Sequence, residues 1–160
     1  MMLKIVSGGQ TGVDRAALDA ALDAGAPCGG WCPPGRIAED GPLAPRYPLR
    51  ELPTGGYRER THANVRDSDG TLVIHCGALE GGTAQTVGFC VAHGKPHQLI
   101  DGNAIPAESA AGLVREFIAR HRIAVLNVGG PRASKQPAIY AYARTVMTLV
   151  LKGERSDRGA

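Results

Sequence analysis

Three times along this chain, a short apolar run ends in a glycine-rich turn and a helical pattern follows. The apolar runs lie at 3–7, 71–76 and 124–128, and each leads directly into glycines. Continuous apolar runs of this length, bounded by glycine, are typical of strands buried on both faces of a parallel sheet. This repeated order restricts the chain to an α/β fold.

Helical patterns separate the apolar runs. In the clearest of them, 107–121, apolar side chains recur with the i, i+3, i+4, i+7 spacing of an amphipathic helix. Further elements are expected as helices at 13–24, 57–69, 81–93 and 137–152, and as a strand at 98–101. This alternation predicts a mostly parallel sheet of about five strands with helices on both faces.

A proline-rich stretch at 27–56 interrupts the alternation. It carries seven of the 11 prolines, together with several glycines. We expect it to be mostly loop, with a short strand near 28–31. Irregular loops of this length inside a compact domain are commonly lids or binding loops, so a lid is our hypothesis.

Length and charge exclude several classes of protein. The 160 residues suit a single domain, which we expect at 1–152, followed by a disordered tail at 153–160. A net charge of +3, from 18 basic and 15 acidic residues, is too balanced to indicate nucleic acid as a partner. There is no signal-peptide pattern and no apolar run near the ~18 residues that a membrane helix needs. We therefore expect a cytoplasmic protein without a membrane partner.

The four cysteines do not form a metal-binding pattern. Cys28 and Cys32 have a spacing compatible with a metal ion, but no second pair follows them. In a chain without an export signal, we expect free thiols and no structural metal.

The glycine turns bring hydrogen-bond donors to the carboxyl ends of the strands. In a parallel sheet these ends share one edge, where helix N-termini and exposed amides favour anions. Hydroxyl and guanidinium groups would add hydrogen bonds to a phosphate or another oxyanion. The candidate ligand-binding residues are Gly8, Gly9, Gln10, Thr11, Gly12, Asp14, Arg15, Arg60, Thr61, Gly81, Gly82, Thr83, Thr86, Gly130, Arg132 and Ser134.

The first turn also allows a purely structural interpretation. Thr11 and Asp14 fit a capping box that would only close the start of a helix. The glycine spacing is not that of a dinucleotide-binding fingerprint, and no Gly-Lys-Ser/Thr sequence indicates a P-loop. A small anionic ligand is therefore favoured over a dinucleotide or the substrate of an ordinary P-loop enzyme.

Five segments together resemble the putative molybdenum carrier family. They are Ser-Gly-Gly-Gln-Thr-Gly-Val-Asp-Arg at 7–15, Gly-Trp-Cys-Pro-x-Gly-Arg-x-Ala-Glu-Asp-Gly at 30–41, Arg-Thr-x-x-Asn-Val at 60–65, Asp-Ser-Asp-Gly-Thr-Leu at 67–72 and Leu-Asn-Val-x-Gly-Pro-Arg at 126–132. This family belongs to a wider group that includes the LOG phosphoribohydrolases and the DNA-processing Smf/DprA proteins. The resemblance implies a Rossmann-like fold, a homo-oligomer such as a dimer or tetramer, and molybdenum cofactor or molybdate bound in the glycine-lined crevice.

One departure from the LOG enzymes bears on catalysis. Their motif Pro-Gly-Gly-x-Gly-Thr-x-x-Glu ends in a glutamate that resembles a catalytic acid, and in this alignment Thr86 takes its place. A threonine cannot exchange a proton near neutral pH as a carboxylate can. Our leading hypothesis is thus a non-catalytic carrier with no catalytic residue assigned. The alternatives are a nucleotide phosphoribohydrolase, using Glu80, Asp14 or Glu39, and a sensor of nucleotides or ADP-ribose.

Overall fold

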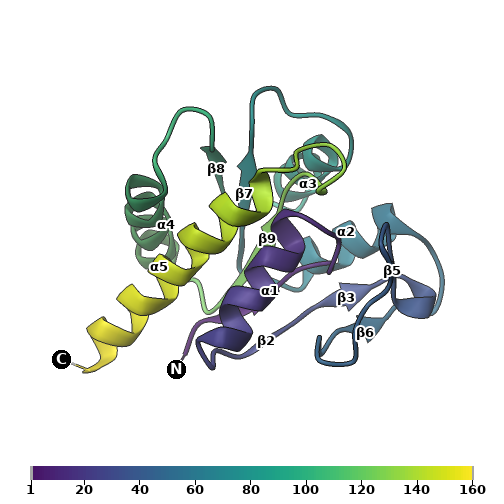
Figure 1. The fold of residues 1–160 in the computed structure, drawn as a ribbon, viewed down its shortest axis with the longest axis horizontal. Helices are drawn as coiled ribbons and strands as arrows, with labels where there is room; N and C mark the ends of the chain where they lie inside the picture. The colour runs from purple at the N-terminus through teal and green to yellow at the C-terminus, as the bar shows by residue number, and fades with distance from the viewer. Residues whose placement is uncertain (1, 160) are drawn as a thin grey trace.

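The computed structural model describes residues 2–159, with side chains as far as residue 153. Its centre is a five-stranded sheet in which every pairing is parallel, in the order β2-β1-β9-β7-β8 (Figure 1). The strands are β1 Lys4–Val6, β2 Cys28–Gly29, β7 Gly70–His75, β8 His97–Asp101 and β9 Val125–Gly129. The predicted single-domain, Rossmann-like α/β fold is confirmed.

The order of the strands places the three glycine turns side by side. β9 lies between β1 and β7, with Val6 paired to Asn127 and Val73 paired to Gly129. These are the three strands that lead into the glycine turns. Because all three run in the same direction, their turns meet at one edge of the sheet.

Helices cover both faces of the sheet. They are α1 Val13–Asp23, α2 Tyr57–Arg66, α3 Gly81–Ala92, α4 Ala107–His121 and α5 Ile139–Gly159. Figure 1 shows α1 and α5 in front of the sheet and α2 and α3 behind it. Among the described residues, no helix is long and apolar enough to cross a membrane.

Small side chains allow α1 to pack closely against α5. Ala16, Ala17 and Ala21 of α1 are fully buried in the main core, which also contains Val146 and Met147 of α5. An alanine face lets two helix backbones approach, because no long side chain separates them. The main core therefore consists mostly of aliphatic residues, as the chain's seven aromatic residues require.

Two element boundaries in the structure differ from those expected from the sequence. α2 ends at Arg66 rather than at 69, since the Asp69 carboxylate accepts hydrogen bonds from the backbone N–H groups of Ala124 and Val125 instead. We expected a tail without regular structure at 153–160, and the backbone of 153–159 continues α5. Residue 160 lies outside the described residues.

The proline-rich stretch forms a small subdomain rather than a bare loop. It contains the strands β3 Trp31–Cys32, β4 Ile37–Ala38, β5 Gly41–Pro42 and β6 Arg50–Glu51, and a 3-10 turn at Pro34–Arg36. The strand expected near 28–31 is divided between β2 and β3. A second cluster of buried side chains joins this subdomain to Leu18 of α1, and it includes Cys32, Leu43, Tyr47 and Leu49. We call residues 27–56 the insertion.

Candidate functional site

A cavity of about 420 Å³ lies at the edge of the sheet where the three glycine turns meet. This volume is within the range of small-molecule sites. Its walls come from the first glycine turn after β1, the second after β7, the third after β9, and from α2. The candidate residues that line it are Gly8, Gln10, Asp14, Arg60, Thr61, Gly81, Gly82, Thr83, Thr86, Gly130 and Arg132.

The start of α3 presents donors to this cavity. Gly81 and Gly82 form its first turn, and a Cβ on Gly81 would lie 3.9 Å from the Lys135 ammonium nitrogen. Thr83 is only 8% exposed, and no partner is found for its hydroxyl among the described residues. Since no fully buried side-chain polar atom there lacks a partner, this oxygen is open to the cavity. Since the N-terminus of a helix carries partial positive charge, these groups bring positive charge to one corner of the cavity, which Glu80, the residue before them, also lines.

Thr86 is already engaged one turn further along α3. Its hydroxyl donates a hydrogen bond to the Gly82 carbonyl oxygen at 2.9 Å. The Thr86 side chain therefore lines the cavity, while its hydroxyl proton is used in the hydrogen bond to the helix backbone.

A buried ion pair, Asp14 with Arg60, lies deep in the same cavity. The Arg60 guanidinium donates to the Gly8 carbonyl oxygen at 3.0 Å and lies 3.7 Å from the Asp14 carboxylate. A side chain at Gly8 would not fit, because a Cβ there would lie 2.2 Å from Arg60 Cδ. Burial raises the pKa of Asp14 from 3.8 to about 6, although the positive charge of Arg60 opposes the shift. Asp14 is thus a carboxyl group that titrates near neutral pH.

Five candidate residues do not line the cavity: Gly9, Thr11, Gly12, Arg15 and Ser134. Gly9 and Gly12 have φ angles of +78° and +81°, so these two glycines shape the backbone of the turn. A Cβ at Gly12 would also lie 2.3 Å from the Pro131 carbonyl oxygen. The remaining three side chains contact the insertion.

Glu39 of the insertion occupies donors that the sequence had assigned to a ligand. Its carboxylate accepts hydrogen bonds from the Ser134 N–H at 3.1 Å, the Ser134 hydroxyl at 2.6 Å and the Thr11 hydroxyl. The Arg132 guanidinium lies 3.6 Å from the same carboxylate. The hydroxyls of Ser134 and Thr11 lower the pKa of Glu39. An anion of the protein itself therefore occupies the donors of Ser134 and Thr11, while Arg132 pairs with it by charge and also lines the cavity.

Arg15 holds the insertion in a similar way. Its guanidinium donates two hydrogen bonds to the Asp40 carboxylate, at 3.0 and 3.1 Å, and one to the Gly9 carbonyl oxygen at 3.1 Å. A two-pronged pair of this kind fixes orientation as well as distance. In this structure Arg15 positions the insertion beside the first glycine turn.

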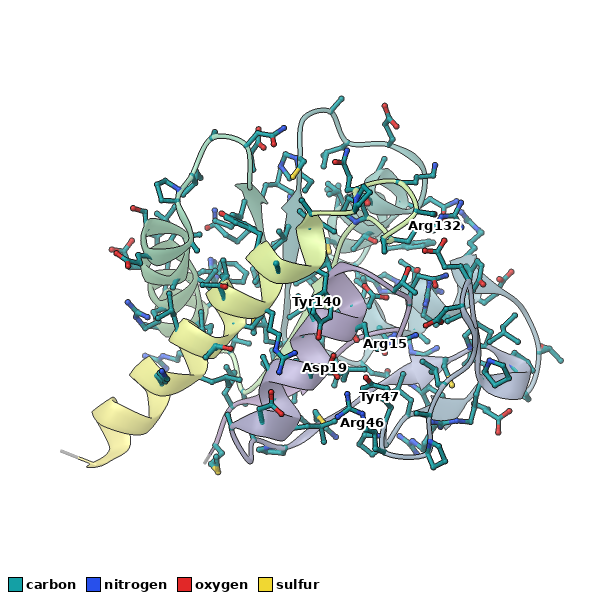
Figure 2. The ribbon with its side chains drawn as sticks, in the orientation of Figure 1. Arg15, Asp19, Arg46, Tyr47, Arg132 and Tyr140 are labelled. Carbon is teal, nitrogen blue, oxygen red and sulfur yellow. The ribbon has the colours of Figure 1, made fainter. Side chains whose placement is uncertain are left out.

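A buried carboxylate that the sequence did not single out completes the attachment. Asp19 of α1 accepts hydrogen bonds from the hydroxyls of Tyr47 and Tyr140 and from the Arg46 guanidinium (Figure 2). These partners belong to the insertion and to α5. Figure 2 shows Arg132 apart from this cluster. The insertion is thus bound to the domain at several points, and its role as a lid stays a prediction.

The sequence did not identify several residues of the cavity wall. They include Tyr57 and Asn64 of α2, Asn127 of β9, and Lys135 beyond the third turn. Asn127 was detectable, since it is a polar residue inside an apolar run, whereas no local pattern marked Lys135. Of the three carboxylates considered for hydrolysis, Asp14 and Glu80 line the cavity.

Metal-binding side chains do not gather in the part of the chain that the structure describes. No group of three or more His, Cys, Asp or Glu residues could hold a metal ion there. The cysteines Cys28, Cys32, Cys76 and Cys90 are free.

The chain resembles one known family over almost its whole length. The model of the circularly permutated YpsA SLOG family matches residues 5–151. A crystal structure titled putative molybdenum carrier protein, from Syntrophus aciditrophicus, is 48% identical, with a TM-score of 0.91 over 94% of this chain and 95% of that chain. No curated protein matches the chain. Because the family model matches nearly the whole chain, the chain belongs to the circularly permutated YpsA family of SLOG proteins.

Proposed function

We propose that the cavity binds a small phosphate-bearing or oxyanionic ligand and that the protein is a non-catalytic carrier. The observation that supports this most is the corner formed by the start of α3, the unpartnered Thr83 hydroxyl and the Lys135 ammonium group. The 48% identical relative is named a putative molybdenum carrier protein. The cargo that we propose is accordingly the molybdenum cofactor or molybdate.

The chemistry of this corner suits a phosphate or molybdate oxygen. α3 has 12 residues, long enough for its first amides to carry substantial partial positive charge. Neither Gly81 nor Gly82 has a side chain to hold an anion away from these amides. Thr83 can donate a hydrogen bond without losing one inside the protein, and Lys135 adds a full charge at the rim.

Arg132 is the second cation of the rim that we assign to the ligand. It lines the cavity and lies beside Glu39, so its guanidinium is already oriented.

We also propose that the protein works in the cytoplasm and that it is a homo-oligomer. Light scattering would test the oligomeric state.

Titration calorimetry with sodium molybdate and with ribose 5-phosphate would test the carrier proposal. Lys135→Ala should weaken the binding of both probes about tenfold, and Thr83→Val should do so by removing only the hydroxyl. Lys152→Ala removes an exposed lysine of α5 and serves as the control. Unchanged affinity in both site variants would contradict the proposed corner.

The hydrolytic alternative can be tested with the same protein. Incubation with nucleoside monophosphates should leave them intact if the protein only binds. Chromatographic detection of free base that depends on the protein would overturn the non-catalytic assignment and favour a phosphoribohydrolase.

A further inference from the structure

The cavity contains a carboxylate where a site for a bare oxyanion should have only donors. Asp14 is 7% exposed, and the contacts of its Oδ2 with the Gln10 N–H and Arg60 are long, at 3.4 and 3.7 Å. Its Oδ1 lies 3.9 Å from the position of a Cβ on Gly129. A phosphate oxygen placed here would meet a like charge. This part of the cavity therefore suits a group that donates hydrogen bonds.

Asn127 adds a second acceptor on the same side. It lies two residues before Gly129 on β9 and so shares its face of the sheet. Its amide nitrogen donates to the Thr71 hydroxyl at 3.2 Å, whereas its Oδ1 has no partner among the described residues. The side chain is only 4% exposed and lines the cavity. Since no fully buried side-chain polar atom of the described residues lacks a partner, Oδ1 is open to the cavity and can accept a hydrogen bond from a ligand.

Tyr57 supplies an aromatic surface in the same cavity. It is 36% exposed, and the Arg60 guanidinium lies 5.2 Å from the centre of its ring. A ring of this kind offers a planar ligand a stacking partner. Two acceptors and an aromatic ring in the lining of one cavity are suited to a flat heterocycle with adjacent N–H groups.

We propose that Asp14 and Asn127 accept hydrogen bonds from the N–H groups of an aminated heterocycle, of the 2-amino-4-oxopyrimidine type that guanine and pterins share. The inference rests on the proposed function, because the phosphate of the same ligand would bind at the start of α3. It assigns the two ends of the ligand to different parts of one cavity. Molybdate or phosphate alone would use only the electropositive end.

The geometry requires a carboxylate at position 14 for this selectivity. An ionised carboxylate can accept from an amino group and a ring N–H at once, whereas an amide at the same place presents one oxygen and one NH₂ group. Burial in the cavity strengthens such hydrogen bonds, because water does not compete with them. A ligand that lacks the amino group would leave an acceptor unsatisfied.

Three probes distinguish the two ends of the site. GMP carries the phosphate and the amino group, IMP lacks only the amino group, and ribose 5-phosphate lacks the heterocycle. In calorimetry at pH 7.5, the native protein should bind GMP about ten to a hundred times more tightly than IMP. Asp14→Asn should bring this ratio close to one while leaving the affinity for ribose 5-phosphate within about twofold.

Asp23→Asn makes the same chemical change on the exposed end of α1 and is the matched control. Equal affinity of the native protein for GMP and IMP would overturn the inference without the need for any variant. A preference for GMP over IMP that is unchanged in Asp14→Asn would also overturn it. If ribose 5-phosphate, GMP and molybdate all fail to bind, the proposed function itself fails, and that result differs from a lost preference for GMP.

Discussion

The carboxylate of Glu39 accepts two hydrogen bonds from Ser134, one from its backbone N–H at 3.1 Å and one from its hydroxyl at 2.6 Å. Glu39 belongs to the insertion, and Ser134 follows the third glycine turn, 95 residues later. This contact attaches the insertion to the edge of the sheet where the cavity lies. A carboxylate of the protein therefore accepts hydrogen bonds from donors of the kind that would bind an oxyanion.

Glu39→Gln should loosen the insertion. The substitution removes the negative charge that faces Arg132 and leaves one acceptor oxygen for the donors of Ser134 and Thr11. Amide hydrogen exchange followed by mass spectrometry should show faster exchange in 37–42 and at the third turn, by about tenfold. Glu116→Gln, on the exposed side of α4, should leave these segments unchanged. Equal exchange in both variants would show that the contact does not hold the insertion.

Arg132→Ala should weaken the binding of molybdate by about 1.5–3 kcal/mol, the range for a hydrogen bond to a charged group. The side chain is 40% exposed, so the fold should change little. The binding constant from calorimetry and the midpoint of thermal unfolding would separate the two effects. Arg120→Ala removes an exposed arginine of α4 and should alter neither quantity. Normal affinity in Arg132→Ala would remove this residue from the site.

Asp14 should lower the stability of the protein at neutral pH. Its folded pKa, about 6, lies above the ordinary value of 3.8, so between these values the folded state binds more protons than the unfolded chain. The contribution of Asp14 is therefore most favourable in acid and falls as the pH rises from about 4 to about 6. At pH 7 the cost reaches at most about 3 kcal/mol.

Urea unfolding at pH 4 and at pH 7 measures this cost. Asp14→Asn should gain stability relative to the native protein as the pH rises, because the amide does not ionise. Asp23→Asn should show no such gain, since it removes an exposed ion pair with Arg144 and not a buried charge. A difference between Asp14→Asn and the native protein that is the same at both pH values would contradict the raised pKa.

Gly8→Ala should destabilise the protein by about 1–3 kcal/mol, the usual cost of overpacking. The new methyl group would lie 2.2 Å from Arg60 Cδ and would displace the guanidinium from the Gly8 carbonyl oxygen and Asp14. Gly112→Ala is the matched control, because nothing lies within 4 Å of a Cβ at that position in α4. The control should gain about 0.5–1 kcal/mol, as alanine favours a helix more than glycine does. Chemical denaturation would compare both variants.

Local sequence patterns were sufficient for most of the secondary structure. The apolar spacing at 107–121 gave the bounds of α4, and the glycine-bounded runs gave β1, β7 and β9 to within about one or two residues. These predictions succeed because helix and strand periodicities are properties of neighbouring residues. The three glycine turns were visible for the same reason.

The neighbours of each functional group depended on the tertiary structure. The sequence presented Thr11, Arg15 and Ser134 as free donors, but only the folded chain brings Glu39 and Asp40 of the insertion against them. No local pattern marked Lys135. The strand order sets β9 beside β7, and this brings Lys135, which follows β9, close to the start of α3, which follows β7.

The sequence by itself therefore determined the α/β class and the glycine turns from which the cavity is built. Only the tertiary structure decided which donors remain for a ligand, and that Asp14 is buried beside Arg60 with a raised pKa. The physical reason is that hydrogen-bond partners and desolvation depend on residues distant in sequence. The Asp14 and Arg60 side chains meet only when α2 packs over the first glycine turn.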